Sequence, residues 1–227
     1  MDSNKHLMLG TWFTLIAMLF FGLAFFPFSG FLPPMSAALT AEEVATSFQQ
    51  HTNGIRFSMI LLLEAGAFFC VLVAVISTQI KRIEGVSSIL SYTQIISGAV
   101  GSVIIIIGGV IMLIAVYRPD RPGEITYMLF DAAWMFIVMP STSYTLQFFC
   151  IGIAILSDKR ATPLFPKWVG YYNFWTGLAI FPGLLIPWFK TGPFAWNGLL
   201  SFWVGVAAFG GWFIIMFFML RRSIRQP

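Results

Sequence analysis

Six long apolar segments alternate with short polar loops along the chain. They cover residues 8–28, 55–78, 88–117, 125–156, 168–189 and 199–220. A helix that crosses a membrane needs about 20 mostly apolar residues, and each segment reaches that length. None of the segments alternates apolar and polar positions, and all are too long for the strands of a membrane barrel. The pattern therefore predicts an all-α integral membrane protein, a six-transmembrane-helix bundle that forms a single domain over residues 1–227.

The one long loop, residues 29–54, contains the pattern of a short helix. Thr40 followed by Glu43 is a capping box, which satisfies free backbone N–H groups at a helix start. Apolar residues recur on one helical face at Ala41, Val44, Ala45 and Phe48. The Asn53–Gly54 pair is typical of a helix end. We therefore predict an amphipathic helix over 41–51 that lies on the membrane surface or covers the end of the bundle.

Composition and charge agree with a membrane protein. Hydrophobic residues make up 58% of the chain and charged residues 10%, against about 25% charged in a typical soluble domain. Basic residues on the side of the two termini are Lys5, Lys81, Arg82, Lys159, Arg160, Lys167, Arg221, Arg222 and Arg225, and those on the other side are Arg56, Arg118, Arg121 and Lys190. Because cytoplasmic loops are enriched in Lys and Arg, this bias predicts a multi-pass protein of the cell (inner) membrane with both termini in the cytoplasm. The net charge of +4 is explained by these flanks, and no nucleic-acid motif is present.

Two acids, Glu64 and Asp131, fall well inside apolar segments. A charged carboxylate at the centre of a membrane helix costs about 2.5–3.5 kcal/mol on insertion scales, so such residues are typical of functional sites. At 1.5 Å per residue, Glu64 lies about 13 Å and Asp131 about 10 Å below the outer ends of their segments. If the second and fourth segments are neighbours, the two carboxyl groups could share one cavity and hold a single proton between them.

The segment that contains Asp131 carries further polar groups. Helical spacing places Thr142 and Thr145 on the stripe of Asp131, with Trp134 and Ser141 at its edge. Pro140 removes a backbone donor and predicts a kink there, and Pro182 and Pro187 are matching breakers in the fifth segment. We interpret this face as the wall of an outward-facing polar site. The basic residues available on the same side for ion pairing or gating are Arg56, Arg118 and Arg121.

Structural explanations of the same residues stay open. Glu64 could be protonated and hydrogen-bonded to a neighbouring helix, and Asp131 could pair with Arg118 or Arg121 to fix a loop. Serine and threonine hydroxyls also bond back to their own helix. Small residues recur four apart at Ser97/Gly101, Gly98/Ser102, Ser201/Gly205 and Ala207/Gly211. Such spacing allows close helix packing, within the chain or in a dimer.

The sequence contains no pattern for a cofactor or a metal. His6 and His51 are the only histidines and lie near segment ends, which excludes haem held by paired histidines inside the bundle. Cys70 and Cys150 lie in apolar stretches without metal-ligand spacing, and we interpret both as small buried hydrophobic residues.

Three functions are consistent with these features. We favour a small transporter or channel-like binding protein for a cation, a proton or a polar head group. One alternative is a non-catalytic accessory or scaffold subunit of a larger membrane complex, and the second is a membrane-embedded lipid-modifying enzyme. Enzyme activity is the less favoured reading because nothing marks a nucleophile. The expected partners are membrane lipids, with further copies of the chain or partner subunits of a membrane complex, and not nucleic acid.

Overall fold

The computed structural model describes residues 3–226, and no strand occurs among them. In chain order the elements are α1 (Ser3–Phe25), α2 (Ala41–Gln50), α3 (Thr52–Ile80), α4 (Ser88–Tyr117), α5 (Gly123–Val138), α6 (Ser141–Leu156), α7 (Lys167–Ile180), the 3₁₀ helix η1 (Phe181–Trp188), the π-helical turn η2 (Leu199–Val204) and α8 (Gly205–Arg225). The predicted all-helical fold is confirmed for this part of the chain.

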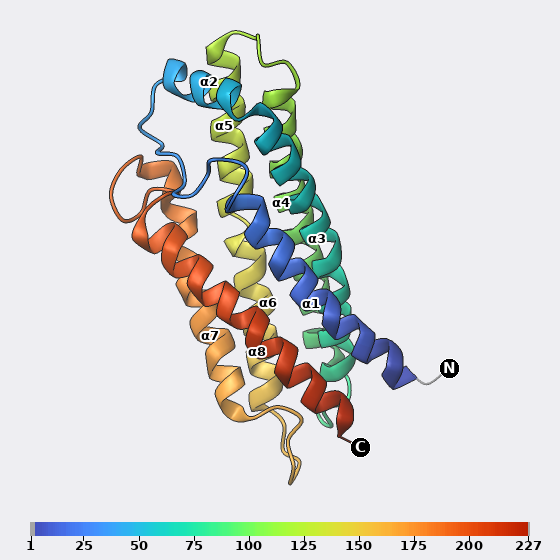
Figure 1. The fold of residues 1–227 in the computed structure, drawn as a ribbon. Helices are drawn as coiled ribbons and strands as arrows, with labels where there is room; N and C mark the ends of the chain where they lie inside the picture. Colours follow the sequence, from blue (N-terminus) through green and yellow to red (C-terminus); the bar gives the residue numbers. More distant parts are fainter. Residues whose placement is uncertain (1–2, 227) are drawn as a thin grey trace.

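Five helical stretches in the described part are long and apolar enough to cross a membrane. They are Asn4–Phe25, Thr52–Ile80, Ser88–Tyr117, Gly123–Leu156 and Leu199–Arg225. The predicted segment 168–189 is not among them, because its α-helix, α7, has only 14 residues and gives way to η1 at Phe181. The two ends of the chain lie at the same end of the bundle, and α2 lies at the opposite end (Figure 1).

Helix α4 packs against α3, α5 and α6. Helix α3 also packs against α1, α6 packs against α7, and α8 packs against α1 and α7. Glycines on α4 make room for α6: a Cβ at Gly98 would lie 2.7 Å from Nε2 of Gln147, and one at Gly101 would lie 2.7 Å from two ring carbons of Tyr144. The small-residue spacing on α4 therefore serves packing within the chain.

The predicted loop helix is present as α2 and ends one residue earlier than expected. The Thr40 side chain accepts a hydrogen bond from the Glu43 backbone N–H, and the Glu43 carboxylate accepts one from the Thr40 N–H at 2.7 Å. This confirms the capping box. Val44 and Phe48 are buried, so the apolar face of α2 covers the end of the bundle, mainly against α5.

The prediction that Asn53–Gly54 ends the loop helix is wrong. Both residues lie in the first turn of α3, which begins at Thr52, and only His51 separates it from α2. Glycine is needed at position 54 for another reason, because a Cβ there would collide with the carbonyl oxygen of Phe28. The glycine at position 54 therefore reflects the close approach of the Phe28 backbone and not the end of a helix.

Three long segments are interrupted near the middle of the bundle. The predicted helix 125–156 is broken at Met139 and Pro140 into α5 and α6. The segment 168–189 changes from α-helix to 3₁₀ helix at Phe181, directly before Pro182. The segment 199–220 starts as a π-helical turn and becomes α-helical at Gly205. Irregular turns of this kind are frequent at functional sites.

Candidate functional site

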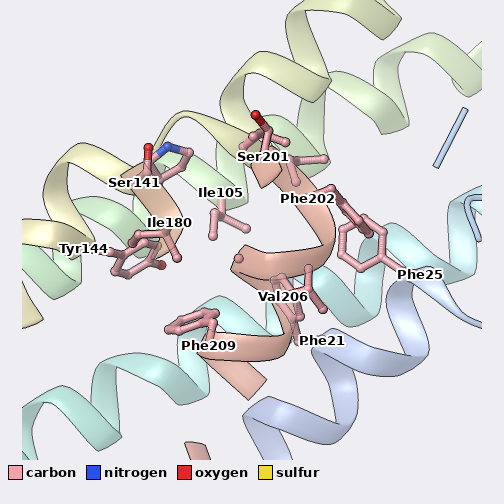
Figure 2. Close-up of a pocket in the computed structure, with 14 residues that line it drawn as sticks. Phe21, Phe25, Ile105, Ser141, Tyr144, Ile180, Ser201, Phe202, Val206 and Phe209 are labelled. Carbon is pink, nitrogen blue, oxygen red and sulfur yellow. The ribbon is translucent and has the colours of Figure 1, made fainter. Parts of the chain in front are cut away.

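A cavity of about 80 Å³ lies where the three interruptions meet. Its walls come from α1, α4, α5, α6, α7, η2 and α8, and its lining residues are Phe21, Phe25, Ile105, Ile137, Val138, Pro140, Ser141, Tyr144, Ile180, Ser201, Phe202, Gly205, Val206 and Phe209. Figure 2 shows Ser141 and Ser201 along one side, and Phe21 and Phe209 along the opposite side. Drug-sized ligands occupy pockets of about 300–1,000 Å³, so this space suits a few water molecules or a small molecule.

The interruptions shape the cavity through side-chain bonds to the backbone. The Ser201 hydroxyl lies 3.0 Å from the carbonyl oxygens of Pro182 and Phe194, which ties η2 to η1 and to the loop before it. The Ser141 hydroxyl donates to the Met139 carbonyl at 3.3 Å, across the α5–α6 break. Hydroxyls replace backbone hydrogen bonds that these breaks remove, as is usual where a buried helix is interrupted.

The chemistry of the walls is apolar with a few hydrogen-bonding groups and no acid or base. Because the Ser141 and Ser201 protons are directed to backbone carbonyls, their oxygens remain free to accept a hydrogen bond. Tyr144 is 6% exposed, and its hydroxyl lies beside Ser102. The end of α5 and the start of α6 also border the cavity, and helix ends leave unpaired carbonyl and N–H groups. The site is suited to a neutral, mainly apolar molecule with one donor group.

The two acids singled out from the sequence do not border this cavity. Glu64 is exposed on the outer surface of α3, and Asp131 is half-buried on α5. Helix α4 lies between those two helices: a Cβ at Gly109 would meet Leu63 of α3, and one at Gly108 would meet Ile137 of α5. The second and fourth segments do meet, because Phe69 of α3 packs against Tyr144 of α6. Asp131 lies on α5 instead, so the structure does not bring Glu64 and Asp131 together.

The basic residues at the α2 end have other neighbours than expected. Lys190, in the loop after η1, is the cation that acts electrostatically on Asp131. Among residues 3–226 neither Arg118 nor Arg121 forms an ion pair, the pair Asp158–Arg160 being the one found there. Arg56 donates to the Val116 carbonyl at 2.9 Å and so caps the end of α4. Its role in the structure is to hold the α3–α4 pair together at this end.

The other predicted site residues are dispersed by the break at Pro140. Ser141 lines the cavity, whereas Thr142 on the next position is exposed on the outer surface. The Thr145 hydroxyl donates to the Gly177 carbonyl at 3.0 Å and joins α6 to α7. Trp134 is fully buried and stacks on Trp196 with ring centroids 6.1 Å apart. The predicted polar stripe assumed one continuous helix, which the break does not allow.

Buried amide side chains outside the predicted site join helices in the interior of the bundle. Gln94 donates to the Val73 carbonyl at 3.0 Å, and Gln147 donates to the Gln94 side chain at 3.4 Å. Trp212 of α8 donates to Asn173 of α7 at 2.9 Å. All of these amides are buried. The sequence signal for these contacts is a polar residue inside an apolar segment, and in this structure such residues form hydrogen bonds between helices.

Both cysteines are free thiols, but only one is buried: Cys150 is, whereas Cys70 is exposed, contrary to expectation. No group of three or more potential metal-ligating side chains occurs among residues 3–226.

Comparison of the chain with protein-family models, with curated proteins and with solved structures finds no match. What the fold defines is an all-helical protein with five helices compatible with a multi-pass membrane protein.

Proposed function

We propose that the chain is a small multi-pass membrane transporter or channel-like binding protein, and that its ligand site is the cavity at the three helix interruptions. The observation that carries the proposal is the convergence on one cavity of the α5–α6 break, the end of α7 at Ile180, where η1 begins, and η2. Irregular backbone at membrane depth is tolerated where it is buried in protein or lines a cavity, and broken helices form the substrate sites of many transporters.

The membrane arrangement that goes with this function has six crossings. In this arrangement α7 and η1 together supply the crossing that α7 is too short to make alone, which agrees with both chain ends lying at one end of the bundle (Figure 1). The nine-to-four basic bias favours a cytoplasmic location for that end. The cavity would then open and close by movement at the interruptions.

The ligand class follows from the walls. A cation or proton site would need Glu64 and Asp131 together, and the helices that carry them are separated by α4. Four phenylalanines and several aliphatic residues face the cavity instead, with hydroxyl oxygens of Ser141 and Ser201 as acceptors. We therefore propose a small neutral solute that is mainly apolar and carries one hydroxyl donor.

The test is a substitution that fills the cavity without disturbing the packing. Gly205 lines the cavity, and a Cβ there would meet Ile180 at 3.8 Å, an ordinary contact. Gly205→Leu should therefore fold and occupy the site. Gly210→Leu is the matched control on the same helix, because a Cβ at Gly210 meets no atom within 4 Å.

The measurement compares the concentrations of small molecules inside and outside cells. Three kinds of cell are used: cells without the chain, cells with the wild-type chain, and cells with one of the two variants. A solute whose distribution depends on the wild-type chain should behave in Gly205→Leu cells as it does in cells without the chain. The Gly210→Leu variant should match the wild type. Wild-type behaviour of a folded Gly205→Leu variant would exclude this cavity as the ligand site.

A further inference from the structure

Glu64 places a carboxyl group on the outer surface of the bundle, without a hydrogen-bond or ion-pair partner in the described part of the chain. It is exposed, and among residues 3–226 it takes part in no ion pair within 4 Å. Its neighbours on the same surface are apolar: Phe57 is 48% and Ile60 52% exposed. The surface of a single chain thus presents one acidic group in surroundings suited to lipid.

The depth of Glu64 makes this position unfavourable in a lone chain. At 1.5 Å per residue it lies about 12 Å from Arg56 and about 25 Å from Lys81, the basic residues nearest the two ends of α3. In the membrane arrangement proposed above, which this inference requires, the carboxyl group is too deep to reach water. Intramembrane acids normally face the protein interior or pair with another polar group.

A second copy of the chain cannot supply a basic partner for Glu64. In a two-fold symmetric membrane dimer, residues from the same depth face each other, and the chain carries no basic residue at the depth of Glu64. The basic residues of the chain lie in loops or toward the helix ends, and Arg56, the nearest in sequence on α3, bonds to the Val116 carbonyl instead. A basic group at this depth has to come from another polypeptide.

We propose that the outer face of α3 around Glu64 binds a transmembrane helix of a different membrane protein, which presents a Lys or Arg at the depth of Glu64. The surface of α3 allows a close approach, because the exposed positions that follow on this side are small, at Ala67 and Ala74. Small residues bring helix backbones together, and a polar pair within such an interface adds specificity. The chain is then one subunit of a hetero-oligomeric membrane complex.

Site-specific photo-crosslinking in cells that express the chain at its natural level tests this proposal. The probe is a benzophenone amino acid at Ala67, and the control position is Val103, which is 52% exposed on the outer face of α4. We expect a protein adduct from Ala67 and none from Val103. Peptide sequencing of the adduct should identify a membrane protein with a basic residue inside an apolar segment.

The dependence on Glu64 separates a specific contact from proximity. Glu64→Leu should reduce the Ala67 adduct roughly three- to tenfold, the range expected for one polar pair between membrane helices. Glu64→Gln, which keeps a hydrogen-bonding group, should lie between the two. Because Glu64 is exposed, both variants should run as the folded wild type in size-exclusion chromatography.

Three results would overturn the proposal: an adduct made of two copies of this chain, adducts with lipid alone, or an adduct that Glu64→Leu leaves unchanged. The outcome does not depend on the cavity, because Gly205→Leu should leave the Ala67 adduct intact. Failure of the docking surface and failure of the ligand site are therefore distinguishable.

Discussion

The substitution Gly101→Ala should destabilise the fold through one contact between α4 and α6. The added Cβ would lie 2.7 Å from Cε1 and from Cζ of Tyr144, and 3.1 Å from its Cδ1. Carbon atoms pack at about 3.5–4.0 Å, so the ring has to move by about 1 Å. Tyr144 also lines the cavity, which couples this packing contact to the candidate site.

The Tyr144 ring has little room to move away. It packs edge-on against Phe69 with ring centroids 5.5 Å apart, lies tilted against Phe209 at 5.4 Å, and stacks on Phe148 at 6.4 Å. Forcing an extra methyl group into a packed core typically costs about 1–3 kcal/mol. We therefore expect Gly101→Ala to lower the free energy of unfolding by about that amount, although alanine is intrinsically the better helix former.

The assay is thermal unfolding of the purified chain in detergent, followed by circular dichroism. Gly22→Ala in α1 is the control, since a Cβ there meets no atom within 4 Å, and it should be neutral or slightly stabilising. A double-mutant cycle with Tyr144→Leu isolates the contact. In the Tyr144→Leu background, Gly101→Ala should have little effect, because the ring that it meets is gone.

Equal stability of Gly101→Ala and the wild type would refute the reasoning. So would a loss of the same size in the presence and absence of the Tyr144 ring. In the first case α4 and α6 would have to be farther apart than the structure shows, and in the second the loss would have another origin than this contact.

Three further predictions concern the ends of the bundle. Thr40→Ala removes the cap of α2 and should destabilise that helix by about 0.5–2 kcal/mol, which hydrogen exchange of the α2 amides would show as faster exchange confined to this helix. The hydrogen bond from Arg160 holds the pKa of Asp158 below its usual value. Asp158 therefore stabilises the fold at pH values above its unfolded pKa of about 3.9, and this contribution is lost as the pH falls through the lower folded pKa. The stability difference between the wild type and Asp158→Asn should shrink in acid, and a pH-independent difference would contradict this prediction. In a background without native cysteines, a membrane-impermeant thiol reagent added to intact cells should label Glu42→Cys and not Arg225→Cys, and the reverse pattern would invert the proposed orientation.

Local signals in the sequence predicted local structure well. The capping box of Thr40 and Glu43 depends on atoms three residues apart, so the start of α2 could be predicted from the sequence alone. Pro140 and Pro182 likewise marked two interruptions, because a missing backbone N–H acts within one helical turn. The Asn53–Gly54 pair misled because glycine serves a turn and a close contact equally well, and only the position of Phe28 distinguishes them.

The sequence by itself determined that the fold is all-helical with several helices long and apolar enough to cross a membrane, since burial in lipid needs only a run of apolar residues. It could not determine which segments are neighbours, because helical periodicity gives the faces of a helix and not the identity of what covers them. The tertiary structure placed α4 between the helices of Glu64 and Asp131 and left Glu64 on the outer surface. It also brought three interruptions, distant in sequence, to one cavity. Those relations arise from side-chain packing between helices, such as Tyr144 against Gly101, and packing of that kind is decided only when all helices are in place.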